Sequence, residues 1–232
     1  MSRAEWRRLA LPGLLAFLFF WIFIGLGVWQ LHRLTWKLGI IAEIRHAQNA
    51  PPIPMPAHPT RFEKVRISGQ WVPGKAALYG DEVHNSPQGP MEGAQLIMPL
   101  REANGTVVLV DLGWVKGQTP KPMPDLPANP SGYVHVQSRP GWFAAPDDPA
   151  HQLYYTLDAQ KIGAGLGLAH VAPYMLIALG PKPPPGSLLP EPAQNLPTPP
   201  NNHYEYALTW FGFAGVLVFE FIFIARKRLR IS

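Results

Sequence analysis

The chain has 232 residues, 28 prolines and no cysteine, and its net charge is +5. The absence of cysteine excludes disulfides, cysteine-ligated metals and a cysteine nucleophile. The positive charge does not indicate a nucleic-acid binder, because basic and acidic residues balance from 32 to 205. The whole surplus lies at the two ends, beside the most apolar segments, which is the distribution expected of cytoplasmic flanks in a membrane protein.

The first apolar segment, residues 9–31, contains no charged residue. As a helix it is long enough to cross a hydrocarbon core of about 30 Å. A cleaved signal peptide would have a shorter apolar stretch that ends in small residues such as Ala-x-Ala. This stretch ends in Gly27-Val28-Trp29-Gln30, which favours an uncleaved anchor. The preceding residues are too few for a mitochondrial transit peptide as well, which indicates a bacterial protein.

The second apolar segment is predicted over about 204–225. Prolines at 197, 199 and 200 prevent an earlier helix start, and Asn202 with Glu205 fits a capping box. Arg226 to Arg230 place its far end in the cytoplasm, so both termini are expected there. Glu220 interrupts the apolar pattern; we expect it to reach the inner interface, with a functional acid as the alternative.

The region between the two segments is predicted to be mainly β. The first helix is expected to continue to about residue 48, before Pro51-Pro52. Alternating apolar residues then predict strands over 62–72, 94–101, 106–115, 133–137 and 173–179, with a short helix over 157–168. Asn104-Gly105 between two apolar runs predicts a two-residue type I′ hairpin.

These features predict an α+β membrane protein, in which two transmembrane helices flank an extracytoplasmic antiparallel β-sheet that curls or closes like a barrel. The predicted segments are 1–48 (first helix), 49–180 (β-rich domain), 181–200 (proline-rich linker) and 201–232 (second helix and basic tail).

Two clusters at the outer ends of the helices are candidates for chemistry. Trp29, Arg33 and Trp36 share one helical face, and Gln30, Arg33 and Lys37 share an overlapping one. Anchoring at the membrane interface would explain tryptophan and arginine here, but Gln30 and the repeated Trp/Arg pattern exceed what anchoring needs.

In the second cluster, His203, Tyr206 and Trp210 share a face of the second helix. An imidazole at this depth could bind haem iron, with aromatic residues against the macrocycle and Arg33 or Lys37 near its propionates. The alternative is a polar residue at a helix start that hydrogen-bonds to the domain. The remaining histidines lack tight metal-ligand spacing, and no hydrolase, phosphate-loop or dinucleotide motif occurs. Asp147-Asp148 is interpreted as a solvated turn.

These motifs resemble the Surfeit-locus-one family of cytochrome c oxidase assembly factors over nearly the whole chain. The matching stretches are Gly-x-Trp-Gln-x-x-Arg-x-x-Trp-Lys at 27–37, Phe-x-x-Val-x-Ile-x-Gly at 62–69, the strand ending at 109–115, and Asn-Asn-His-x-x-Tyr-Ala-x-Thr-Trp at 201–210.

The resemblance implies a non-enzymatic helper in the bacterial inner membrane, with both termini cytoplasmic and a periplasmic domain. It would assist insertion of haem a into the main subunit of a haem-copper oxidase, with haem a synthase as a further partner and no nucleic acid. Carried over from the family, the haem-binding histidine is His203, and His32 lies at a suitable depth for a second axial ligand. The alternative is a permanent structural subunit of a respiratory complex, without haem handling.

Overall fold

The computed structural model describes residues 3–86, 89–117, 121, 126, 128–136, 145–184 and 187–230. It divides into two compact units. The helix unit is Met1–Glu43 with Thr198–Ser232, and the sheet unit is Ile44–Pro197.

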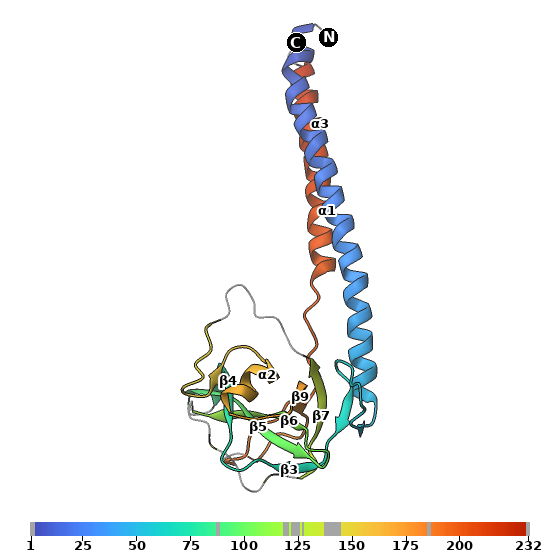
Figure 1. Ribbon diagram of the computed structural model, residues 1–232. Helices are drawn as coiled ribbons and strands as arrows, with labels where there is room; N and C mark the ends of the chain where they lie inside the picture. The colour runs from blue at the N-terminus through green and yellow to red at the C-terminus, as the bar shows by residue number, and fades with distance from the viewer. Residues whose placement is uncertain are drawn as a thin grey trace. The chain divides into compact units, whose positions relative to one another are not determined.

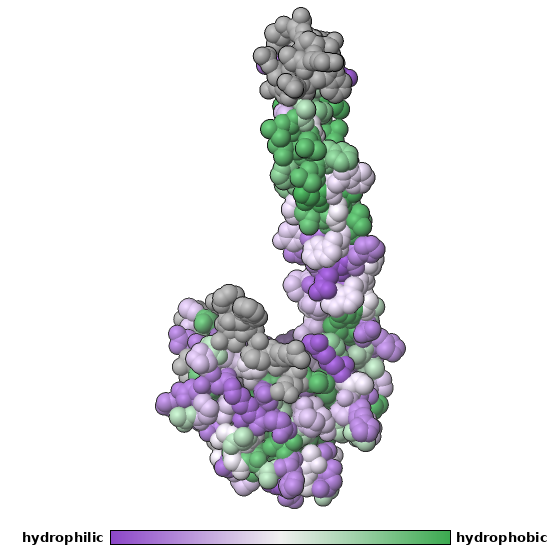
Figure 2. Space-filling view, turned by 45° about the horizontal axis from the view of Figure 1, so that its top comes forward, coloured by the Kyte–Doolittle hydropathy of each residue, from purple (hydrophilic) through white to green (hydrophobic). Residues whose placement is uncertain are grey.

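The helix unit consists of most of α1 (Arg3–Asn49) and all of α3 (His203–Arg230), which lie side by side and antiparallel (Figure 1). Both contain a segment long and apolar enough to cross a membrane, Ala10–Asn49 and His203–Lys227. Large apolar side chains such as Phe17, Val216 and Phe219 are exposed, and apolar surface dominates much of the visible helix pair (Figure 2). Exposed apolar surface of this length is compatible with a lipid environment, because water would penalise it.

The sheet unit contains nine strands and one short helix among its described residues. In chain order they are β1 (Ile53–Pro54), β2 (Lys64–Arg66), β3 (Gly69–Trp71), β4 (Ala77–Ser86), β5 (Gly89–Glu102), β6 (Val107–Lys116), β7 (Ser131–Val136), β8 (Leu153–Tyr154), α2 (Ala159–Gly165) and β9 (Val171–Ala178). The strand order is β1-β2-β7-β9-β6-β5-β4-β8, and β3 also pairs with β5.

The prediction of an antiparallel sheet is wrong in part, because the sheet is mixed. The pairs β1–β2, β4–β8 and β6–β9 are parallel. Parallel neighbours need a long connection, and the chain between β6 and β9 passes through β7, β8 and α2 before it returns. Apolar alternation identifies a strand but carries no information on the direction of its partner, so this feature was not predictable from the pattern.

The sheet curls because β2 and β3 are almost continuous but pair with different strands. β2 pairs with β7, and after only two residues β3 pairs with β5, on the other side of β9 and β6. The predicted strand over 62–72 is therefore split into two short strands. The change of partner between β2 and β3 gives the sheet the barrel-like curvature that was predicted.

Strand β4 was not predicted. Gly80 interrupts its apolar pattern with a positive φ of 76°, at the point where the register with β5 shifts between Tyr79 and Glu82. The bulge moves the following side chains to the opposite face, which hides the alternation in the sequence.

The two faces of the sheet form separate apolar clusters. One includes Leu96, Met98, Val108, Val110 and Leu176. The other includes Ile97, Leu109, Met175 and, from α2, Ile162 and Leu166. Residues adjacent in sequence alternate between the clusters, as a strand requires. Each fully buried side chain of this size contributes about 1.5–3 kcal/mol, so both faces stabilise the unit.

The hairpin between β5 and β6 is at the predicted place but has a different turn. Gly105 donates to the carbonyl of Glu102 at 2.9 Å, and Glu102 donates to Thr106 at 2.9 Å. Gly105 has a φ of 87°, whereas Asn104 is not among the residues with positive φ. This is a three-residue loop with glycine in the left-handed position and not a type I′ turn. Asn104 contributes through its side chain, whose Oδ1 accepts from the amide of Thr106 at 2.8 Å.

The segment predicted as a proline-rich linker includes residues that pack on the sheet unit. Glu191 forms an antiparallel bridge with Trp114, and Ala193 pairs with Leu179. Leu196 is buried, and its amide donates to the side chain of Gln48 at 2.8 Å.

Candidate functional site

The helix pair contains one polar contact between its two helices that involves a predicted site residue. His203 Nδ1 lies 2.6 Å from Gln30 Oε1. Gln30 is 9% exposed, although it stands in an apolar helix, and His203 is half-buried at the first turn of α3. A carboxamide oxygen only accepts hydrogen bonds, so Nδ1–H of the imidazole is the donor.

Small residues set the distance between the helices beside this contact. A Cβ at Gly27 would lie 2.5 Å from the ring of Phe211, so only glycine leaves room for that ring. Ala207 and Ala214 are buried on the facing side of α3. Phe23 stacks on Trp210, with 5.8 Å between ring centroids. Close approach through small residues fixes the register of apolar helices, and here it places Gln30 opposite His203.

The predicted clusters are brought together only in part. His203 and Trp210 face α1, but Tyr206 is 55% exposed and lies outside the helix contact. Trp29 and Trp36 are also more than half exposed.

The cationic residues of the first cluster lie beside this contact in the sequence of α1. The guanidinium of Arg33 lies 3.8 Å from the centroid of the Trp36 ring, a cation–π contact. Lys37 is half-buried and His32 is exposed. This end of the helix pair therefore carries two cations together with exposed aromatic side chains, among them those of Trp29, Trp36 and Tyr206.

The donor set here is a single imidazole, which would fit an iron already held by a haem macrocycle better than a metal ion held by protein ligands alone. Among the described residues, no group of three or more histidine or acidic side chains could hold an ion. When Nδ1–H is donated to Gln30, Nε2 is the ring nitrogen that carries the lone pair in the neutral form of an imidazole. Asn201, two residues earlier, has a buried Oδ1 for which the structure gives no hydrogen-bond donor. A buried acceptor without a donor is what a ligand or partner can satisfy.

Gln30 stood out in the sequence but was not predicted to be among the ligand-binding residues. Its signal was an amide in an otherwise apolar segment, where each buried polar group needs a partner. The partner is 173 positions away in the sequence, and helical periodicity does not identify such a residue.

The sheet unit contains a buried acid, Asp111, in the stretch that was interpreted only as the end of a strand. Burial raises its pKa to about 7; the hydrogen bond from the Gly113 amide opposes the rise and the charge of Glu82 adds to it. Burial, with Asp111 as the next cause, raises the pKa of Tyr133 to about 12. The ring of Trp114 stacks on that of His84, with 4.3 Å between the ring centroids. Nε1 of Trp114 donates to the carbonyl of Glu82 at 3.3 Å.

Asp147 is also more than the solvated turn that was predicted. Its Oδ2 forms an ion pair with Lys161 of α2, and its Oδ1 accepts from the amide of Tyr155 at 2.7 Å. Asp147 thus connects the residues after β8 to the helix that covers the sheet.

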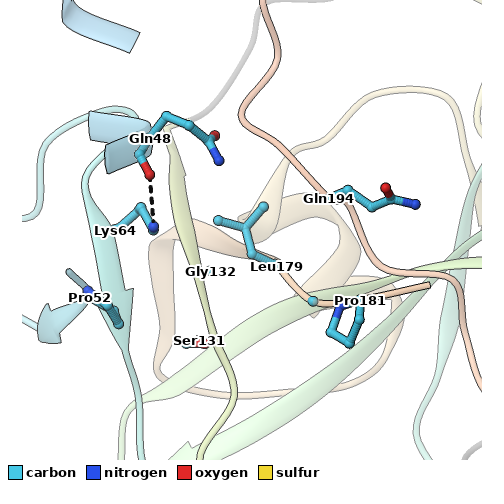
Figure 3. Close-up of a pocket in the computed structure, with 9 residues that line it drawn as sticks. Gln48, Pro52, Lys64, Ser131, Gly132, Leu179, Pro181 and Gln194 are labelled. Carbon is cyan, nitrogen blue, oxygen red and sulfur yellow. Dashed lines mark hydrogen bonds between the residues drawn. The ribbon is translucent and has the colours of Figure 1, made fainter. Parts of the chain in front are cut away.

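A cavity of about 430 Å³ lies in the sheet unit, where α1 ends beside β2 and β7 (Figure 3). It is lined by Gln48, Pro52, Lys64, Ser131, Gly132, Leu179, Gly180, Pro181 and Gln194. The Lys64 ammonium donates to the carbonyl of Gln48 at 3.1 Å, shown by the dashed line. Since cations favour the carboxyl ends of helices, this lysine stabilises the end of α1. None of the predicted site residues lines the cavity.

Comparison with known proteins gives a consistent result over most of the chain. The model of the SURF1 family matches residues 17–215. A SURF1-like protein of Rickettsia conorii is 28% identical over 226 residues, which cover 94% of this chain and 92% of the relative. A second, from Rickettsia felis, is 28% identical and covers 90% and 94%. Surfeit locus protein 1 of Rattus norvegicus is 26% identical, covering 81% and 67%.

Proposed function

Since this chain belongs to the SURF1 family, which is generally associated with cytochrome c oxidase assembly, we propose that it assists delivery of haem a to the main subunit of a haem-copper oxidase. Members of the family are assembly factors rather than enzymes. The observation that carries the proposal is the imidazole of His203, held between two apolar helices with one nitrogen hydrogen-bonded to Gln30 and the other left as a lone-pair donor.

In this proposal each residue of the two clusters has a chemical role. His203 Nε2 would bind the haem iron, and the haem would supply the redox centre of the oxidase. Arg33 and Lys37 would hold the propionates through charge-assisted hydrogen bonds. His32 would be a second candidate ligand to the iron. Flat apolar contact with the macrocycle comes from the aromatic residues Trp29, Trp36, Tyr206 and Trp210.

The proposed setting is a bacterial inner membrane, which both apolar helices cross. Their basic flanks support cytoplasmic termini, and this orientation puts the sheet unit in the periplasm. The relatives in Rickettsia support a bacterial member. The proposed partners are the main oxidase subunit, which receives haem a, and haem a synthase, which supplies it.

The test is an absorption spectrum of the full-length protein purified from cells that make haem a. His203→Ala should remove or strongly shift the haem spectrum while the protein remains in the membrane. His46→Ala, at an exposed histidine near the end of α1, is the matched control and should leave the spectrum unchanged.

Arg33→Ala is the companion variant. It should weaken haem retention without changing the ligand spectrum, because a lost propionate contact leaves the iron bond intact. Normal haem content in both variants, together with stoichiometric co-purification with the mature oxidase, would instead support a permanent structural subunit.

A further inference from the structure

We propose that Gln30 is the positioning residue for His203: it holds the imidazole as the Nδ1–H tautomer and directs Nε2 away from α1 as the nitrogen that binds a ligand. This inference rests on the proposed function for the identity of that ligand, haem iron, but not for the state of the imidazole.

The first step is the chemistry of the contact. A neutral imidazole has one N–H and one bare nitrogen, and they exchange roles between its two tautomers. Oε1 of Gln30 carries no proton, so the 2.6 Å contact requires the hydrogen on Nδ1 of His203. The bare nitrogen is then Nε2, and only a bare nitrogen can bind a metal.

The direction of Nε2 follows from the geometry of the ring. The two ring nitrogens are separated by one carbon, and the directions in which they form hydrogen bonds or bind a ligand diverge widely. Because Nδ1 points at Gln30 on α1, Nε2 points away from that side chain. The close contact of Gly27 with Phe211 and the buried Ala207 hold the two helices in this register, which keeps Gln30 opposite His203.

The third step is why this position holds an amide. Gln30 is buried, and a buried polar group without a partner destabilises a protein. Pairing with His203 satisfies the Oε1 acceptor of Gln30 and the Nδ1–H donor of His203 at once. A hydrogen bond of this kind on the nitrogen that does not bind the metal orients ligating histidines in many metalloproteins, and its loss commonly weakens binding 10–100-fold.

The competing explanation is that Gln30 serves only in helix packing. The protonation of the two ring nitrogens of His203 distinguishes this explanation from a positioning role. The full-length protein, labelled with ¹⁵N-histidine and purified in detergent without haem, reports the protonation of each ring nitrogen through its chemical shift. Subtracting the spectrum of His203→Ala assigns the signal of His203 among the eight histidines.

We expect wild-type protein to show a protonated Nδ1 and a bare Nε2 at His203. Gln30→Met, similar in size but without an acceptor, should lose this Nδ1–H signal and retain haem about tenfold less well or worse. Gln30→Glu keeps an acceptor oxygen and should restore the signal, which also covers the case in which Gln30→Met fails to fold.

The inference is overturned if wild-type His203 has a bare Nδ1, or if Gln30→Met keeps the Nδ1–H signal or binds haem as well as wild type. A haem spectrum unchanged in His203→Ala would overturn the haem function and leave the assigned tautomer standing, so the two failures are distinguishable.

Discussion

Asp111 Oδ1 accepts a hydrogen bond from the amide of Gly113, two residues further along β6, at 2.9 Å. Gly113 has a φ of 109°, and a Cβ there would lie 2.0 Å from the carbonyl oxygen of Glu191. The bond therefore holds a backbone conformation that brings Trp114 into its bridge with Glu191. The residue that accepts this bond is buried, since Asp111 is only 5% exposed.

The first prediction is that the contribution of Asp111 to stability falls as pH rises from about 4 to 7. Burial raises the pKa of Asp111 from 3.8 to about 7, so over this range the folded protein keeps a proton that the unfolded chain releases. This contribution to stability is complete below the unfolded pKa and is lost as pH rises through the folded one, by up to roughly 4 kcal/mol.

Asp111→Asn keeps an acceptor for the Gly113 amide but does not ionise. The variant should therefore unfold at higher denaturant concentration than wild type at pH 8, with little difference at pH 4. Denaturant titration of the purified protein at both values measures this. Equal midpoints at pH 8 would mean that Asp111 ionises in the folded protein without penalty.

The second prediction concerns the hairpin loop. Gly105→Val should destabilise the protein by about 1–2 kcal/mol, because a side chain at a φ of 87° is strained although the surrounding space is open. Gly105→Asn should lose less, since asparagine tolerates the left-handed region. Chemical denaturation compares the two, and equal losses would contradict strain as the cause.

The third prediction concerns helix contact at Gly27. Gly27→Val should lower the thermal midpoint in detergent, because its side chain would overlap the Phe211 ring. Gly25→Val is the matched control, as no atom lies within 4 Å of the corresponding Cβ. Combining Gly27→Val with Phe211→Ala should recover part of the loss. Additive effects in the double variant would show that the two residues do not contact each other.

The fourth prediction concerns topology, and its basis is the charge at the two ends of the chain. A reporter fused after Lys116 should be active on the extracytoplasmic side, and one fused after Ser232 in the cytoplasm. Alkaline phosphatase and green fluorescent protein fusions distinguish the compartments. Activity of both fusion sites on the same side would rule out two membrane crossings.

Most of the local structure could be predicted because its signals are local. Apolar length and basic flanks identified both long helices, and Gly105 located the hairpin. β4 was missed since Gly80 and its bulge break the alternation, and the type I′ turn was wrong because the side chain of Asn104 bonds to Thr106 while its backbone keeps a negative φ. For the candidate site, the sequence pointed to His203 and Arg33, and their part in ligand binding stays a prediction.

The sequence by itself determined two apolar helices, a β-rich region between them and the motifs of the family, because periodicity and short motifs depend on neighbouring residues. Only the tertiary structure decided that Gln30 meets His203, that Asp111 is buried, and that β9 runs parallel to β6. Each of these joins residues far apart in the chain or depends on what covers a side chain. Such contacts follow from helix register and sheet order, which form only when the whole chain packs.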